Sequence, residues 1–219
     1  MGRLILVFAL IFSTSNHIAL SAEAELPVGP LAEVVNLMSQ NKVQAGQFTQ
    51  ERTISGLSQV LTSSGQYYIQ ADMGIVWQQI LPFEDLLVVK ENKLYSQVGM
   101  ELVAQEVPSN VVALMTDIFS GLMTGDPSTL QRQFELNVVK EQAGINPTHD
   151  WSVVLRPKFS PLDSIFDHID LVGKGSSLKQ IGLIELSGDS TKIELTSSSE
   201  NQSSTIKHWL DLSWSGSQD

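Results

Sequence analysis

The sequence contains no cysteine among its 219 residues. Disulfide bonds, thiolate metal sites, a cysteine nucleophile and a lipid-modified N-terminal cysteine are therefore excluded. Positive charge is also scarce, because 13 Lys and Arg stand against 24 Asp and Glu and leave a formal net charge of −11. A nucleic-acid partner would need clustered Lys and Arg to contact phosphates, so the composition argues against one.

Long apolar runs are missing after the N-terminus. At the N-terminus itself, Arg3 precedes an apolar run over residues 4–12, which is too short to span a bilayer. Ala22-Glu23-Ala24 follows and fits an A-x-A cleavage pattern. We therefore expect residues 1–24 to be a cleaved signal peptide and residues 25–219 to form a single domain; an uncleaved membrane anchor is the alternative. Secretion without cysteines suggests a periplasmic protein, exported across the inner membrane of a Gram-negative bacterium.

Sequence motifs of catalysis and metal binding are missing as well. The histidines that follow the predicted signal peptide are His149, His168 and His208. They have neither HExxH nor HxH spacing, and the chain has no GxSxG, P-loop or GxGxxG motif. Asp163, Asp167 and Asp170 lie close together, but on a predicted strand edge, where a solvated charged face is the commoner explanation. We therefore predict a protein that is not an enzyme and that holds no cofactor or metal.

The most informative stretch of the chain, residues 65–95, alternates β-rich runs with turns. Gly74 supplies the flexible residue that a tight turn needs, and Pro82 cannot donate to a strand ladder. Glu91-Asn92 turns the chain once more. Three turns in so short a stretch predict an antiparallel meander rather than alternating βα units. Such a sheet either stacks on another sheet or curls around an apolar interior.

The remaining segments add further short strands and a few helices. Predicted helices cover residues 30–41, 111–123 and 126–133. Predicted strands outside the meander cover residues 43–52, 59–63, 101–107, 134–141, 151–156, 165–172, 179–185, 191–196 and 209–214. The fold class is therefore α+β and mostly β, with about ten antiparallel strands.

The predicted helix over residues 111–123 is almost uncharged, with Asp117 as its one charged residue. A helix this apolar must be covered, and its methionines suit a surface that adapts to varied apolar partners. Ordinary core packing explains the composition equally well. We expect this helix to close over the concave face of the sheet.

Several residues of the first half occur in the order and spacing of the LolA family, the periplasmic carriers of outer-membrane lipoproteins. The matching residues are Phe48-Thr49-Gln50, Gly65, Trp77, Pro82, Leu86-Leu87-Val88 and Leu94-Tyr95. The chain resembles this family over residues 31–95, and its later part looks more like a divergent LolA-related branch. The resemblance implies an unclosed antiparallel β half-barrel with a helical lid over an apolar cavity. It also implies that acyl chains of a cargo lodge there during transit between the inner and outer membranes.

Apolar side chains of the meander and of the 111–123 helix favour binding of an apolar ligand over catalysis. The candidate cavity residues are Phe48, Tyr67, Ile75, Trp77, Leu86, Val88, Leu114 and Ile118. A register shift of one residue would invert the face that points inward, so the lining strand face stays open at this point. The expected cargo is an acylated lipoprotein or another lipid, such as a pigment lipid. A monomer would pass it between inner- and outer-membrane transfer proteins.

The sequence departs from the family at the lid. The family's latching arginine would fall on Ala71, and no Arg or Lys lies between Arg52 and Lys90. A lid without this latch would be held mainly by apolar contact. Two other functions stay open: a periplasmic lipid-sensing or interaction module without transfer activity, and an enzyme of lipid modification, which the missing site constellation disfavours.

Overall fold

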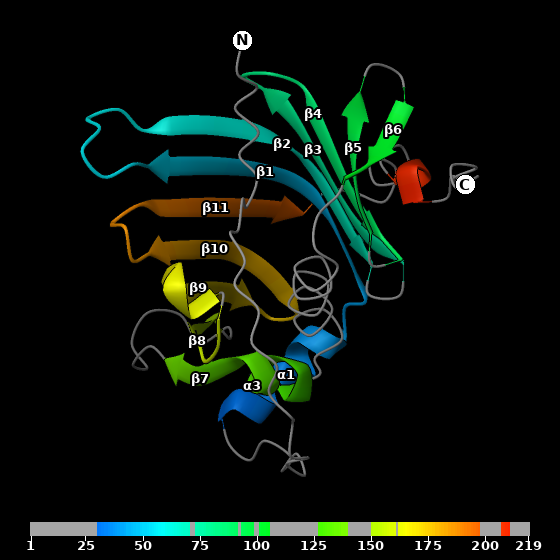
Figure 1. The fold of residues 1–219 in the computed structure, drawn as a ribbon. Helices are drawn as coiled ribbons and strands as arrows, with labels where there is room; N and C mark the ends of the chain where they lie inside the picture. Colours follow the sequence, from blue (N-terminus) through cyan, green and yellow to red (C-terminus); the bar gives the residue numbers. More distant parts are fainter. Residues whose placement is uncertain are drawn as a thin grey trace.

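Eleven antiparallel strands form one sheet, in the order β6-β5-β4-β3-β2-β1-β11-β10-β9-β8-β7 (Figure 1). The computed structural model describes residues 30–70, 73–91, 93–98, 101–105, 127–139, 150–160, 162–197 and 207–210. The strands are β1 (Val43–Thr53), β2 (Leu61–Gln70), β3 (Gly74–Leu81), β4 (Asp85–Lys90), β5 (Lys93–Val98), β6 (Glu101–Ala104), β7 (Phe134–Val139), β8 (Asp150–Pro157), β9 (Phe166–Lys174), β10 (Ser177–Glu185) and β11 (Ser190–Ser197). The helices are α1 (Pro30–Ser39) and α3 (Pro127–Gln133), with a 3₁₀ turn, η1 (Leu162–Ser164). In this part of the chain β6 and β7 are the two edges, so the sheet is open.

The two halves of the chain meet at β1. Phe48 lies opposite Gly65 of β2, its neighbour in sequence, and opposite Leu195 of β11, which comes from the far end of the chain. The strands β2–β6 then follow in chain order on one side of β1, and β11–β7 follow in reverse order on the other. Gly175 and Gly188 turn the chain between β9, β10 and β11, with φ angles of 54° and 87° that favour glycine.

The helices α1 and α3 lie on one side of the curved sheet, which we call the inner face (Figure 1). Val34 and Met38 of α1 and Leu130 of α3 are buried in the same hydrophobic cluster as Phe48. Pro30 suits the first position of α1, where its missing N–H would have no partner within the helix. The helices are therefore held on the sheet by apolar contact with its inner face.

Strand alternation assigns the residues of the meander to two faces. On β2, Tyr67 belongs to the inner cluster, whereas its neighbour Tyr68 belongs to a second cluster on the opposite, outer face. A helical turn at residues 207–210 lies against this outer face, where Leu210 is buried with Tyr68 and Val88. The sheet therefore carries a separate apolar cluster on each face.

The structure confirms the predicted meander as β2–β5, the open, mostly β architecture, and the helices at residues 30–41 and 126–133, the first of which ends at Ser39. The strand predicted over residues 209–214 is wrong at its start, because residues 207–210 are helical. Trp209 and Leu210 both pack on the outer cluster, which consecutive residues of a strand could not do.

The predicted lid helix, with Leu114 and Ile118, lies outside the described residues. Among the described residues, no helix combines the length and apolar character needed to span a bilayer.

Candidate ligand-binding face

Three aromatic side chains lie close together on the inner face. The rings of Phe48 and Trp77 are stacked, with centroids 3.9 Å apart and planes inclined by 22°. Tyr67, directly opposite Trp77 on the neighbouring strand, has its ring centroid 6.2 Å from that of Trp77. Phe48 and Tyr67 are almost fully buried, whereas Trp77 is half-buried. Trp77 is therefore the member of this group whose surface remains accessible.

Glycines opposite the aromatic residues let the strands approach closely. Gly65 lies opposite Phe48, and a Cβ added there would be 1.9 Å from the carbonyl oxygen of Gln78. Gly46 lies opposite Tyr67, and a Cβ there would be 1.7 Å from the carbonyl oxygen of Thr196. Both obstacles are backbone atoms that a side-chain rotation cannot move away. A larger residue at either position would therefore force the strands apart beneath the aromatic group.

A similar pairing recurs in the second half of the sheet. Trp151 lies opposite Gly173, and a Cβ added to Gly173 would be 2.0 Å from an atom of the indole ring. The indole N–H of Trp151 donates to the carbonyl oxygen of Gly175 at 2.8 Å. The polar atom of this buried side chain is thus satisfied, and its ring adds to the inner apolar surface.

The phenol of Tyr67 is part of an apolar surface rather than a source of charge. Its side chain is 1% exposed. Burial raises the pKa of Tyr67 from its ordinary value of 10.0 to about 12, because removing an ion from water disfavours the charged form. Tyr67 is therefore neutral at physiological pH.

The inner cluster continues across the sheet and is free of buried charge. It includes buried side chains from both halves of the sheet, among them Ile69, Ile75, Val89, Leu94, Val153, Leu155, Ile169, Leu171, Ile181, Ile193 and Leu195. The buried polar residues of the described chain are Gln44 and Thr191. Gln44 donates from its amide nitrogen to the carbonyl oxygen of Ser176 at 3.3 Å. A surface of this kind suits hydrocarbon rather than a charged group.

The predicted cavity residues separate into two sets. The structure brings Phe48, Tyr67 and Ile75 together in the inner cluster, with the partly buried Trp77 packed against it. Leu86 and Val88 are buried on the outer face instead. Their sequence neighbours Leu87 and Val89 take the inner positions on β4, since Leu87 pairs with Trp77 and Val89 with Ile75. Leu114 and Ile118 are not among the described residues, and a ligand-binding role for any of the eight stays a prediction.

The prediction also omitted inner-face residues of the second half, such as Trp151, Val153 and Leu155. Their alternation along β8 was the signal that could have identified them, because buried and half-buried side chains alternate there. The sequence did predict the strand, but nothing local shows that it faces the same interior as β2 and β3.

The outer cluster is covered by the chain itself. Tyr68, Val76, Leu86 and Val88 pack around Leu210, which is 0% exposed. The ammonium group of Lys90 donates to the carbonyl oxygen of Leu210 at 2.6 Å. This hydrogen bond and the apolar contact fix the 207–210 turn on the outer face, which leaves the outer cluster filled.

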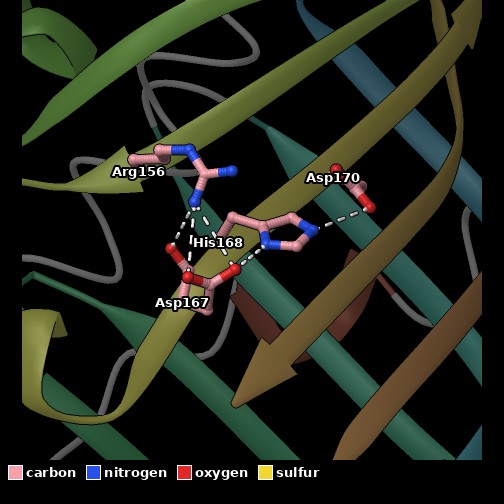
Figure 2. A network of polar contacts seen from close by, with 4 residues as sticks. All are labelled: Arg156, Asp167, His168 and Asp170. Carbon is pink, nitrogen blue, oxygen red and sulfur yellow. Dashed lines mark hydrogen bonds and ion pairs between the residues drawn. The ribbon is translucent and has the colours of Figure 1, made fainter. Parts of the chain in front are cut away.

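A polar network lies on β8 and β9 (Figure 2). The ring of His168 lies between two carboxylates, with Nδ1 2.5 Å from Oδ2 of Asp167 and Nε2 3.5 Å from Oδ2 of Asp170. Nη1 of Arg156 lies 3.3 Å from Oδ1 of Asp167. The hydrogen bond from His168, followed by the charge and hydrogen bond of Arg156, lowers the pKa of Asp167. Asp167 and Arg156 are exposed, so the network has the character of a paired, solvated surface.

The described residues contain no group of three or more His, Asp, Glu or Cys arranged to hold a metal ion. The carboxylates of the network in Figure 2 are already engaged by Arg156 and His168. The inner face is therefore the better candidate for a functional site.

Comparison with known proteins gives one family and several similar structures. The model of the family "Outer membrane lipoprotein carrier protein LolA" matches residues 39–208. Similar solved structures include the LolA superfamily protein NE2245 from Nitrosomonas europaea, at 5% identity and a TM-score of 0.39 over 77% of this chain and 92% of that one. Others are the MucA/MucB complex of Pseudomonas aeruginosa, at 12% and 0.44 over 78% and 59%, and LprF from Mycobacterium bovis, at 11% and 0.38 over 76% and 91%. No match was found among the curated proteins.

Proposed function

The chain belongs to the LolA family of outer membrane lipoprotein carrier proteins, and from this premise we propose that it binds acyl chains of a lipoprotein or another lipid on its inner face and carries them between the inner and outer membranes. Carriage requires export, so the proposal includes cleavage of residues 1–24 and a periplasmic location. No catalytic step is involved.

The observation that carries the proposal is the uncharged aromatic group on the inner face. Phe48 and Trp77 stack on each other, and the half-buried ring of Trp77 offers a flat apolar surface beside them. Each methylene group that leaves water gains about 0.8 kcal/mol, so a partly covered acyl chain suffices for binding. One acyl chain provides only a marginal hold on a membrane, so it can leave the bilayer for a protein surface of this kind and return to a bilayer later.

The proposed lining residues follow from the inner cluster rather than from the outer one. Phe48, Tyr67, Ile75 and Trp77 remain candidates, and Leu87 joins them through its pairing with Trp77. Leu86 and Val88 are better explained as packing residues beneath Leu210. The 111–123 segment, with Leu114 and Ile118, remains the proposed cover of the acyl chain.

Two tryptophans provide a matched test, because each is half-buried and they lie on opposite faces. Trp77 is packed against the inner cluster and Trp209 against the outer one. The mature protein is titrated with an environment-sensitive fatty-acid probe, as wild type, Trp77→Ala and Trp209→Ala, with folding checked by circular dichroism. We expect saturable binding by wild type, about tenfold weaker binding by Trp77→Ala, equivalent to roughly 1.4 kcal/mol, and unchanged binding by Trp209→Ala.

Absence of binding by wild type, or equal weakening by the two substitutions, would contradict lipid binding on the inner face. Movement of a labelled lipid from donor to acceptor vesicles then separates carriage from sensing. A carrier accelerates that movement, whereas a lipid-sensing or interaction module binds the probe without accelerating it.

A further inference from the structure

One end of the sheet, which we call the rim, gathers four connections between strands in the part of the chain that the structure describes. They are residues 54–60 after β1, 82–84 after β3, 186–189 after β10, and the segment between β8 and β9. Because neighbouring strands run in opposite directions, these connections all lie at the same end of the sheet. The strand order β4-β3-β2-β1-β11-β10-β9-β8 also makes them successive neighbours. Figure 1 shows the β1–β2 and β10–β11 connections side by side at the left.

The rim holds most of the exposed large apolar side chains of the described residues. Leu57, Val60, Phe83, Phe159 and Leu186 lie in the four connections, and Ile80 and Leu81 lie at the end of β3, directly before the rim. Those elsewhere are Val43 and Val103. Phe83, at the tip of the β3–β4 turn, is 77% exposed. Single exposed apolar residues are ordinary, whereas a group of them on adjoining loops marks an interaction surface.

Hydrogen bonds hold the rim loops in place before any partner arrives. The side-chain amide of Gln79 donates to the carbonyl oxygen of Phe83 at 3.0 Å. The backbone N–H of Leu186 donates to the carbonyl oxygen of Ile165 at 2.8 Å and joins the β10–β11 turn to the segment before β9. Loops fixed in this way lose little conformational entropy on binding, which favours affinity.

A third fixed point joins the β1–β2 loop to the β10–β11 turn. The backbone N–H of Ser55 donates to Oδ1 of Asp189 at 2.9 Å. Nη2 of Arg52 lies 3.2 Å from Oδ2 of Asp189 and 3.6 Å from Oε1 of Glu185. The N–H of Ser55, followed by Arg52, lowers the pKa of Asp189. The positive charge of Arg52 is thereby engaged within the rim.

The charge of the rim is negative on balance. Its four connections contain Glu84, Asp163 and Asp189 as acids and Lys158 as the one base. Lys158 is itself engaged, since its ammonium group donates to the carbonyl oxygen of Gln131 at 2.8 Å. Glu84 is exposed directly beside Phe83. The rim therefore combines apolar loop tips with carboxylates.

We propose that the rim is a docking surface for a partner protein whose contact surface combines an apolar groove with Lys or Arg side chains. Charge complementarity selects this partner over two other occupants. An anionic lipid surface would repel a chain of net charge −11 that presents carboxylates at its contact loops. A second copy of the chain would bring the same carboxylates against each other. Leu162 and Ile165 of the β8–β9 segment pack in the inner cluster. The exposed rim side chains, such as Phe83, are not part of that cluster, so the proposal is independent of lipid binding.

The test uses a synthetic amphipathic peptide of Leu and Lys as the probe, with a matched peptide of Leu and Glu. The full mature protein is compared as wild type, Phe83→Ser, Glu84→Gln and, as a control, Val103→Ser on β6. Phe83→Ser and Val103→Ser leave the net charge unchanged, so general attraction between the acidic protein and the basic peptide is the same in both. We expect Phe83→Ser to weaken binding of the Leu/Lys peptide by about tenfold or more. Glu84→Gln should weaken it less and lower its salt dependence, and Val103→Ser should match wild type.

Equal binding by Phe83→Ser and Val103→Ser would overturn the proposal. So would equal binding of the Leu/Glu peptide, stronger binding to vesicles of phosphatidylcholine with phosphatidylglycerol, or self-association of wild type that Phe83→Ser abolishes. Fatty-acid binding by Phe83→Ser should equal that of wild type. This readout separates failure of the rim from failure of the inner face.

Discussion

The inner and outer faces of the meander are both apolar, yet they are completed in different ways. On the outer face, Leu210 fills the space between Tyr68 and Val88, and the hydrogen bond from Lys90 fixes it there. On the inner face, the ring of Trp77 stays half-buried beside Phe48. Burial alone does not distinguish the two, since Leu86 is 1% exposed and Ile75 is 5% exposed. The two faces differ in their cover: Leu210 packs on the outer cluster, whereas the ring of Trp77 on the inner face remains partly accessible.

The largest expected effect follows from a substitution at Gly65, where the missing side chain lets the strands approach closely beneath the aromatic group of the inner face. Gly65→Ala places a methyl group 1.9 Å from a backbone oxygen, so we expect the free energy of unfolding to fall by about 3 kcal/mol or more. Gly182 is the control, because a Cβ there would be 3.3 Å from the Cβ of Asp170. Gly182→Ala should change stability by less than about 1 kcal/mol. Urea denaturation measures both, and equal losses would contradict the role given to Gly65.

Truncating one buried residue on each face should separate stability from binding. Leu86→Ala and Ile75→Ala each remove buried methyl groups, so each should lower the free energy of unfolding by about 2–4 kcal/mol. Ile75→Ala should also weaken binding of the fatty-acid probe, whereas Leu86→Ala should not. Denaturation curves and probe titrations on the same preparations test this. Weaker probe binding by Leu86→Ala alone would reverse the assignment of the faces.

The smallest expected effect is the pH response of Tyr67. The pKa of Tyr67 rises to about 12 in the folded protein, while the unfolded chain ionises near the ordinary value of 10.0. The free energy of unfolding therefore holds its full value below about pH 10 and falls between about pH 10 and 12, where only the unfolded chain loses the proton. The loss amounts to roughly 2–3 kcal/mol. Tyr67→Phe lacks this ionisation, so its stability should decline less over the same interval. Parallel decline of wild type and Tyr67→Phe in alkaline denaturation would show that Tyr67 is not shielded from water.

The sequence predicts the meander well because each of its turns contains a local signal, such as Gly74 or Pro82. It does not predict which face of β4 points inward. The run Leu86-Leu87-Val88-Val89 is apolar throughout, so it has no alternation from which the face could be inferred. The inner face of β4 follows only from its pairing with β3, where Leu87 meets Trp77.

The outer cluster and the rim could not be predicted for a related reason. Leu210 reaches Tyr68 and Val88 from the far end of the chain. The rim likewise joins Ser55 to Asp189 across 134 positions. The contact between Ser55 and Asp189 depends on the pairing of β1 with β11. No local pattern in the sequence encodes that pairing or the contact of Leu210 with the meander.

The most direct test of the inner face as the ligand face is quenching of tryptophan fluorescence by a fatty acid that carries bromine on its chain. One variant keeps Trp77 alone, through Trp151→Phe, Trp209→Phe and Trp214→Phe; the other keeps Trp209 alone, through Trp77→Phe, Trp151→Phe and Trp214→Phe. Saturable quenching of the Trp77 protein, with little quenching of the Trp209 protein, is the result that lipid binding on the inner face predicts. Quenching of Trp209 alone, or of neither tryptophan, would contradict it.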